Sequence, residues 1–140
     1  MTKDECAEPP APLLLKGIEE FNRGEFFEQH ETLEAAWRAE PRPVRELYQG
    51  ILQIGVACYH VERGNLSGAL KVLERGLRRL RPFAPECRGI DVARLIADAE
   101  RLRDQVNRLG MDRLQRLDRT HFPKVMWSGS WTTETLGHKE

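Results

Sequence analysis

The segment from Phe21 to Arg38 holds the highest density of side chains able to do chemistry in this 140-residue chain. Within it, His30 and Glu34 are four residues apart, and at that spacing two residues of a helix lie on the same face. An imidazole and a carboxylate placed in this way can hydrogen-bond to each other or bind one metal ion together. Because buried polar groups need partners, the pair predicts either a polar layer satisfied within the fold or a ligand site.

The metal interpretation rests on a short pattern and lacks a third ligand. His30-Glu31-Thr32-Leu33-Glu34 resembles the zinc-protease pattern His-Glu-x-x-His, with glutamate in place of the second histidine. A stable site needs at least one more protein ligand, and none follows at a suitable spacing. A divalent metal at His30 and Glu34 is therefore open but not favoured. No catalytic residue can be assigned, and the sequence leans away from an enzyme.

The elements that must position this pair all read as helices. Apolar residues recur at helical spacing, and no segment alternates as a strand would. The predicted fold class is therefore all-α, a compact bundle of about five helices with an irregular C-terminal tail. The predicted domain organisation is a flexible arm over 1–11, a bundle domain over 12–117 and a partly docked tail over 118–140. The five helices are expected to span about 12–23, 25–39, 44–63, 66–81 and 91–109.

The second predicted helix should bury an aromatic face that includes the polar pair. On a helical wheel this face contains Phe26, Phe27, His30, Leu33, Glu34 and Trp37. A short proline-containing loop makes the second and third helices antiparallel neighbours. His30 is then level with Gln53, and Glu34 with Gln49. His60 lies roughly 10 Å further along the axis, which weighs against a compact triad with His30 and Glu34.

The tail after residue 117 carries more aromatic side chains than a disordered segment would. The aromatic set is His121, Phe122, Trp127 and Trp131. Phe122, Trp127 and Trp131 together could bury several hundred square ångströms, since each of these aromatics buries about 150–250 Å². We expect the tail to dock on its own bundle, and a second copy of the chain is the alternative partner.

Composition bounds the class of protein. Hydrophobic residues make up 40% and charged residues 31%, and no apolar run reaches the length of a membrane span. The acidic N-terminus has no apolar signal core, so we expect a cytoplasmic protein that does not bind a membrane. Three widely spaced cysteines predict neither a disulfide framework nor a thiolate zinc site.

The formal net charge of zero hides an asymmetry along the chain. Residues 1–40 hold four Lys or Arg against ten Asp or Glu, whereas residues 71–116 hold twelve against seven. Oppositely charged ends of this kind could pair within the fold or between subunits. The basic excess is modest and no aromatic residues interleave it, so nucleic acid is not favoured as a partner.

A longer set of residues carries a family resemblance. The run Phe21-Asn22-x-Gly24-x-Phe26-Phe27-Glu28-x-His30-Glu31-x-x-Glu34-x-x-Trp37 resembles the bacterial and archaeal family named domain of unknown function 309. Gln53, His60-x-x-x-Gly64-Asn65-x-x-Gly68-Ala69 and Gly76-Leu77 are also similar to it, so the resemblance covers about residues 13–82. It implies a compact all-helical bundle with no established activity. The recognisable positions are His30, Glu31, Glu34, Trp37, Gln53 and His60.

These observations support three hypotheses about function. The leading one is a small binding protein with a buried polar pocket between the second and third helices, taking an unknown small ligand. Its predicted ligand-binding residues are His30, Glu31, Glu34, Trp37, Gln53 and His60. The alternative is a helical interaction module or homo-oligomer in which the polar layer is purely structural. The third is a metal-dependent hydrolase.

Overall fold

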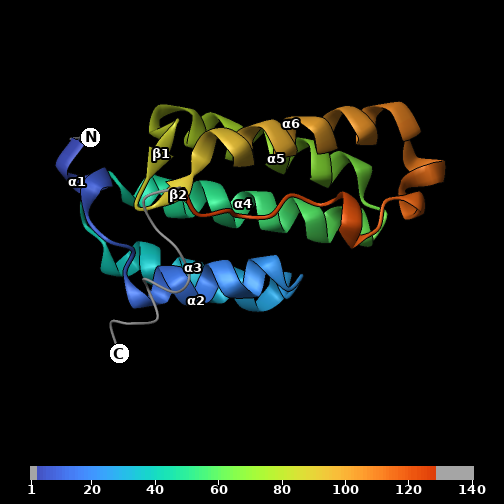
Figure 1. Ribbon diagram of the computed structural model, residues 1–140. Coiled ribbons are helices and arrows are strands. Elements are labelled where there is room, and N and C mark those ends of the chain that lie inside the picture. The colour runs from blue at the N-terminus through green and yellow to red at the C-terminus, as the bar shows by residue number, and fades with distance from the viewer. Residues whose placement is uncertain (1–2, 129–140) are drawn as a thin grey trace.

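The computed structural model describes residues 3–128, which form a helical bundle in three layers (Figure 1). Helices α2 (Pro12–Asn22) and α3 (Phe26–Ala39) form one layer, α4 (Arg45–Glu62) lies in the middle, and α5 (Leu66–Leu80) and α6 (Val92–Leu109) form the other. The prediction of an all-α bundle is confirmed, and each main helix ends within a residue or two of its predicted bounds. None of the described helices is long and apolar enough to cross a bilayer.

Helix α4 is the centre of the core, as its nearly continuous apolar surface predicts. Ten of its 18 residues are buried, more than in any other described helix. Its contact with α5 is close because both helices carry glycine there. A Cβ atom on Gly76 would lie 2.7 Å from Ile54 Cδ1, and one on Gly50 would lie 2.8 Å from Leu80 Cδ2. Larger residues at either position would push the two helices apart.

Short elements connect and cover the main helices. A 3₁₀ turn, Arg81–Phe83, leads from α5 into a two-stranded antiparallel sheet of β1 (Glu86–Cys87) and β2 (Ile90–Asp91). The sequence predicted no strand, and that prediction is wrong in this part of the chain. Strands of two residues are too short to show the alternation that identifies a strand in sequence. Two further 3₁₀ turns, Met111–Arg116 and Arg119–His121, follow α6.

The N-terminal segment differs from the flexible arm that the sequence predicts. Residues Lys3–Ala7 form the short helix α1, and a disulfide joins Cys6 to Cys87 at the end of β1. The backbone N–H of Arg88 also donates to the carbonyl of Cys6 at 2.7 Å. The expectation of no disulfide is therefore wrong. The two cysteines are 81 residues apart, a spacing that gives no sign of pairing in sequence.

The chain after α6 turns back along the bundle and lies beside α4 between the two outer layers (Figure 1). Phe122 is buried and packs on Phe26 of α3 with ring centroids 5.9 Å apart. The side chain of Asn22 exchanges two hydrogen bonds with the backbone of Val125, at 2.8 and 2.9 Å. As far as Ser128 the tail thus docks on its own bundle, and Trp131 lies outside the described residues.

Candidate functional site

Helix α3 is rotated relative to the arc predicted from its aromatic residues. Its buried residues are Phe26, Gln29, Leu33 and Ala36. Phe27, predicted to be in the core, is 66% exposed. The two phenylalanines are adjacent, so only one of them can face α2 and α4. The helical wheel placed Phe27 in the core and Gln29 outside it. In the structure, Gln29 is buried and Phe27 is exposed.

Gln29 is the buried polar residue of α3, and it takes the place that the sequence gave to His30. Its Nε2 donates to the carbonyl of Leu52 on α4 at 3.2 Å, and the residue is fully buried. Gly55 makes the room for it, because a Cβ atom there would lie 2.6 Å from Gln29 Nε2. This glutamine and glycine pair fixes the register of α3 against α4. The sequence feature that could have indicated this contact is Gly55, a glycine within an otherwise apolar helix.

His30 and Glu34 lie beside each other on a half-exposed edge of α3. Their side chains are 46% and 34% exposed, and His30 Nδ1 is 3.9 Å from Glu34 Oε2. The other carboxylate oxygen of Glu34 accepts from Arg38 Nη2 at 2.5 Å. Glu31 is exposed on the same helix. The sequence placed the pair on one face correctly, but the prediction that this face is the core face is wrong.

Trp37 and Gln53 belong to a polar network that links α3, α4 and α5. The guanidinium of Arg45 stacks 4.4 Å from the Trp37 ring, and Trp37 Nε1 donates to Glu46 at 3.5 Å. Arg79 of α5 donates to Glu46 at 3.0 Å and to Gln53 at 3.1 Å. Among the described residues, no hydrogen bond joins Gln53 or Gln49 to His30 or Glu34. The network therefore fills the place in which the sequence suggested a pocket.

His60 lies near the far end of α4, away from this network. Its Nδ1 is 3.2 Å from Asn65 Nδ2, and Asn65 caps α5 by accepting from the N–H of Gly68. His60 therefore contacts the turn into α5, at a distance along α4 from Gln53 as its place in the sequence predicts. Within residues 3–128, no group of three His, Cys, Asp or Glu side chains is placed to hold a metal ion. A site at His30 and Glu34 would need its further ligands from elsewhere.

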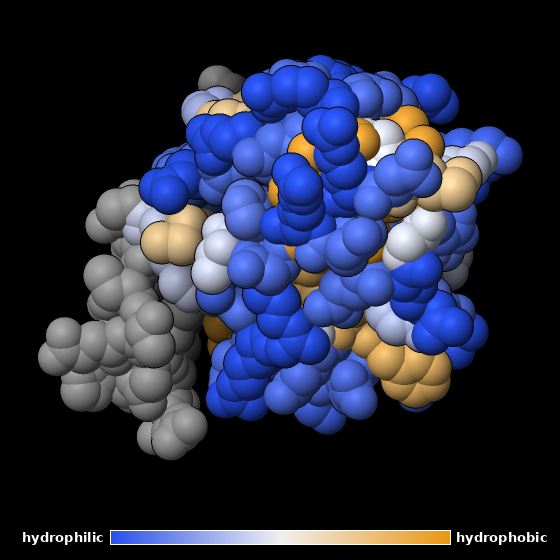
Figure 2. Space-filling view, turned by 90° about the vertical axis from the view of Figure 1, so that its right-hand side faces the viewer, coloured by the Kyte–Doolittle hydropathy of each residue, from blue (hydrophilic) through white to orange (hydrophobic). Residues whose placement is uncertain are grey.

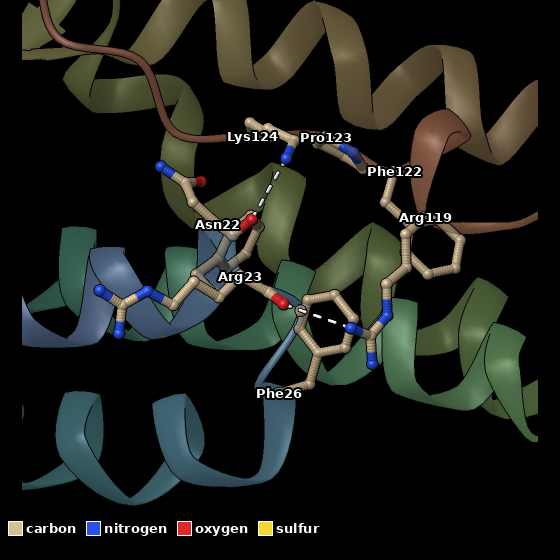
Figure 3. Close-up of a pocket in the computed structure, with 9 residues that line it drawn as sticks. Asn22, Arg23, Phe26, Arg119, Phe122, Pro123 and Lys124 are labelled. Carbon is tan, nitrogen blue, oxygen red and sulfur yellow. Dashed lines mark hydrogen bonds between the residues drawn. The ribbon is translucent and has the colours of Figure 1, made fainter.

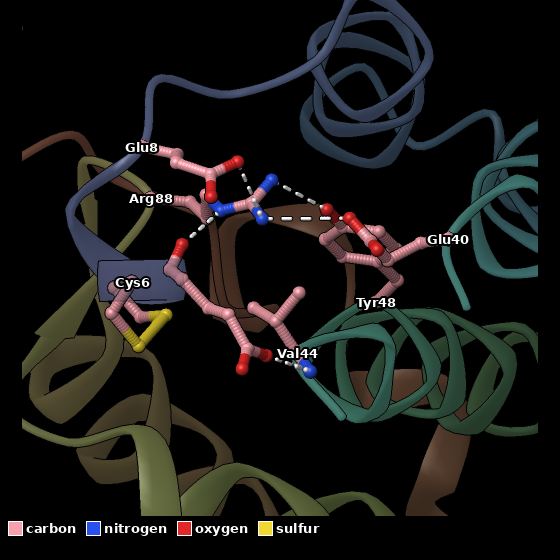
Figure 4. Close-up of a disulfide and its surroundings, with 8 residues drawn as sticks. Cys6, Glu8, Glu40, Val44, Tyr48 and Arg88 are labelled. Carbon is pink, nitrogen blue, oxygen red and sulfur yellow. Dashed lines mark hydrogen bonds and ion pairs between the residues drawn. A yellow bond between two sulfur atoms is a disulfide. The ribbon is translucent and has the colours of Figure 1, made fainter. Parts of the chain in front are cut away.

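A cluster of polar side chains surrounds Arg88, and no sequence pattern predicted it (Figure 4). Arg88 is 2% exposed and has a φ of 54°. Its guanidinium donates to the Tyr48 hydroxyl at 2.8 Å and to the carbonyl of Glu5, and it lies 3.4 and 3.5 Å from the carboxylates of Glu8 and Glu40. The cluster joins α1, α3, α4 and the β1–β2 turn beside the disulfide. Its members come from four segments, so no local motif could predict it.

Arg42 makes the stability contributed by this cluster depend on pH. It donates to Glu40 and, together with Arg88, lowers the pKa of that carboxyl from 4.5 to about 2. A carboxyl whose pKa is lower in the folded state stabilises the fold fully above about pH 4.5, and this contribution is lost as the pH falls toward 2.

We expect the Glu40→Gln variant to be less stable than the parent at neutral pH and to lose less stability between pH 4.5 and 2. Urea unfolding at several pH values in this range measures this. Glu100→Gln, in an exposed pair with Arg81, is the control and should follow the parent. Parallel pH profiles for the Glu40→Gln variant and the parent would contradict the assignment.

A small hollow of about 90 Å³ opens where the docked tail meets the turn between α2 and α3 (Figure 3). Phe21, Phe26 and Phe122 supply aromatic walls. The polar groups at its rim are already bonded, since Lys124 Nζ donates to the carbonyl of Asn22 at 3.2 Å and Arg119 donates to the carbonyl of Arg23 at 3.3 Å. Arg119 also pairs with Glu62 at 3.1 Å. These bonds hold the docked tail against the bundle at this hollow.

Comparison with known proteins confirms the predicted resemblance. Residues 14–72 match the family described as Domain of unknown function (DUF309). Uncharacterized protein YpuF of Bacillus subtilis (strain 168) is 34% identical over 85 residues, which cover 59% of this chain and 49% of that protein. An uncharacterized protein of Aquifex aeolicus (strain VF5) is 25% identical over 91 residues, which cover 64% of this chain and 27% of that protein. The chain thus spans half or less of these relatives. No solved structure matches significantly.

Proposed function

We propose that this chain, which carries a DUF309 domain over residues 14–72, is a helical interaction module whose docking face is the outer side of α3. The observation that carries the proposal is the exposure of Phe27. Its side chain is 66% exposed, whereas the next residue toward the N-terminus, Phe26, is 4% exposed. Aromatic residues are enriched at protein interfaces, where they act as anchors.

The charges around Phe27 indicate the chemistry of the partner. Glu28 and Glu31 are exposed on the same side of α3 as Phe27, and neither of them has an ion pair among the described residues. His30 and Glu34 border this group. We define Phe27, Glu28, His30, Glu31 and Glu34 as the α3 face. An acidic surface around one aromatic residue fits a protein segment that presents an apolar side chain between lysines or arginines.

The end of the bundle where α3 begins has a mostly hydrophilic surface (Figure 2). Figure 2 faces the end that holds the α2–α3 and α4–α5 turns, and its hydrophobic side chains form small separate patches within a hydrophilic surface. Trp37 donates a hydrogen bond to Glu46, and Gln53 accepts one from Arg79. These bonds are partly buried and do not take part in the α3 face. His60 contributes to the turn into α5. A cytoplasmic location remains part of this proposal.

The test compares Phe27→Ala and Glu31→Lys with the parent in co-purification from the native host. Met111→Ala is the matched control, because Met111 is 64% exposed and lies outside the α3 face. We expect the α3 variants to lose a protein that the parent and control retain, with unfolding free energies within about 0.5 kcal/mol of the parent. Equal recovery of every protein by all variants would refute the proposal that the α3 face docks a partner. Light scattering that shows a dimer lost only in the α3 variants would identify the partner as a second copy.

A further inference from the structure

A second and larger hollow lies between α6 and the docked tail, on a different part of the bundle from the α3 face. Its volume is about 260 Å³. One wall is formed by Arg94, Asp98 and Arg101, whose spacing of four and three residues puts them on one face of α6. The other wall is the tail from Thr120 to Met126. We propose that this hollow binds a small phosphate ester.

The charge of the lining favours an anion. The lining contains three basic side chains, Arg94, Arg101 and Lys124, and a single carboxylate, that of Asp98. The lining therefore carries a net charge of about +2 when His121 is neutral. Asp118 is a further carboxylate close to the hollow but not in its lining, and it accepts hydrogen bonds from Thr120. A doubly charged phosphate would balance the charge of the lining.

Asp98 holds both guanidinium groups in place without using all their donors. Its two oxygens lie 3.4 Å from Arg94 Nε and 3.0 Å from Arg101 Nη1. The Asp98 side chain is only 15% exposed, whereas those of Arg94 and Arg101 are 58% and 67% exposed. A guanidinium has five N–H donors, so both arginines keep donors for a ligand oxygen. Each guanidinium presents its remaining donors in the planar arrangement that matches the oxygens of a phosphate.

The opposite wall is fixed by hydrogen bonds that cross the bundle. Lys124 Nζ donates to the carbonyl of Asn22 at 3.2 Å, and the carbonyl of Met126 accepts from the N–H of Asp91 at 2.8 Å. The first bond directs the Lys124 ammonium to α2, and the second holds the backbone of the tail against the start of α6. A wall whose backbone is fixed before binding loses less conformational entropy when the ligand arrives.

Met126 indicates what the ester carries. It is 42% exposed and lines the hollow beside the cations, whereas Phe122 is already buried against Phe26. An apolar group attached to the phosphate would cover the Met126 side chain. The volume is slightly below the usual range for drug-sized ligands, about 300–1,000 Å³, which favours a small monoester over a nucleotide polymer.

The experiment titrates the full chain with phenyl phosphate and follows binding by calorimetry or by amide NMR shifts. We expect saturable binding that is tighter than that of inorganic phosphate, with no binding of phenol. Arg101→Ala and Arg94→Ala should each weaken binding about tenfold or more, because each removes charge-assisted hydrogen bonds. Arg108→Ala changes the net charge equally on the same helix outside the hollow, and it should change the affinity less than about twofold.

Three outcomes would overturn the proposal. The first is the absence of saturable phenyl phosphate binding. The second is an equal loss in Arg108→Ala and Arg101→Ala, which would mark diffuse attraction between charges. The third is binding to phosphatidic acid vesicles that depends on Arg101, with no binding of phenyl phosphate, which would assign the cations to a lipid headgroup. None of these outcomes bears on the α3 face, because the variants that test that face lie elsewhere.

Discussion

Reduction of the disulfide between Cys6 and Cys87 is expected to lower the free energy of unfolding by about 3–4 kcal/mol. The bond closes a loop over a sequence separation of 81 residues, and a cross-link over so long a loop removes much conformational freedom from the unfolded chain. It also holds α1 against β1. From α1, the Glu5 carboxylate accepts a hydrogen bond from the backbone N–H of Val44, at the start of α4, at 3.0 Å. Reduction should therefore loosen the contacts of α1 as well.

Urea unfolding with and without reductant measures this effect, and the Cys6→Ser/Cys87→Ser double variant is the control. The oxidised parent should be more stable than the reduced parent, and the double variant should match the reduced parent under both conditions. Thiol titration of the unfolded chain should find only Cys58 in the oxidised parent and all three cysteines after reduction. Equal stability of the oxidised and reduced parent would show that the cross-link does not support the fold.

The oxidation state also bears on where the protein works. Disulfides form and persist in oxidising compartments and are rare in the cytosol. The cytoplasmic location proposed from the sequence therefore predicts that the reduced form is the one present in cells. Thiol trapping in intact cells tests this directly.

The helices were predictable because each has its own apolar period and clear ends. The rotation of α3 was not, since Phe26 and Phe27 compete for one position and the choice depends on Gly55 of another helix. Gln29 was overlooked for the same reason, because a glutamine becomes a core residue only where its partner makes room. The Arg88 cluster depends on contacts between segments up to 83 residues apart, and such contacts leave no local pattern. The basic hollow leaves no local pattern either, because its two walls belong to α6 and to the tail and meet only after the tail docks.

Removing the charge of Arg88 should destabilise the protein more than any change at the surface. We expect Arg88→Met to cost about 3–5 kcal/mol, the range observed when one partner of a buried ion pair is removed. The Arg88 side chain is 3% exposed, and the Glu40 side chain that it faces is only 12% exposed. Without it, the carbonyl of Glu5 and the hydroxyl of Tyr48 lose their donor as well. Urea unfolding at pH 7 measures the loss, under oxidising conditions with the disulfide verified by thiol titration.

Two further variants separate the charge from the change in shape. Arg81→Met removes an exposed arginine that pairs with Glu100 at 3.5 Å, and it should cost less than about 1 kcal/mol. Arg88→Met combined with Glu40→Gln should cost less than the sum of the two single changes, because the second change removes the carboxylate left unpaired by the first. Simple additivity would show that Arg88 acts through its packing, and a cost equal to that of Arg81→Met would show that the cluster contributes no more than a surface pair. Arg42 still faces Glu40 in the double variant, at 2.9 Å in the parent, so the recovery should be partial. A partial recovery would identify electrostatic compensation within the cluster as the link between α1, α3 and the β1–β2 turn.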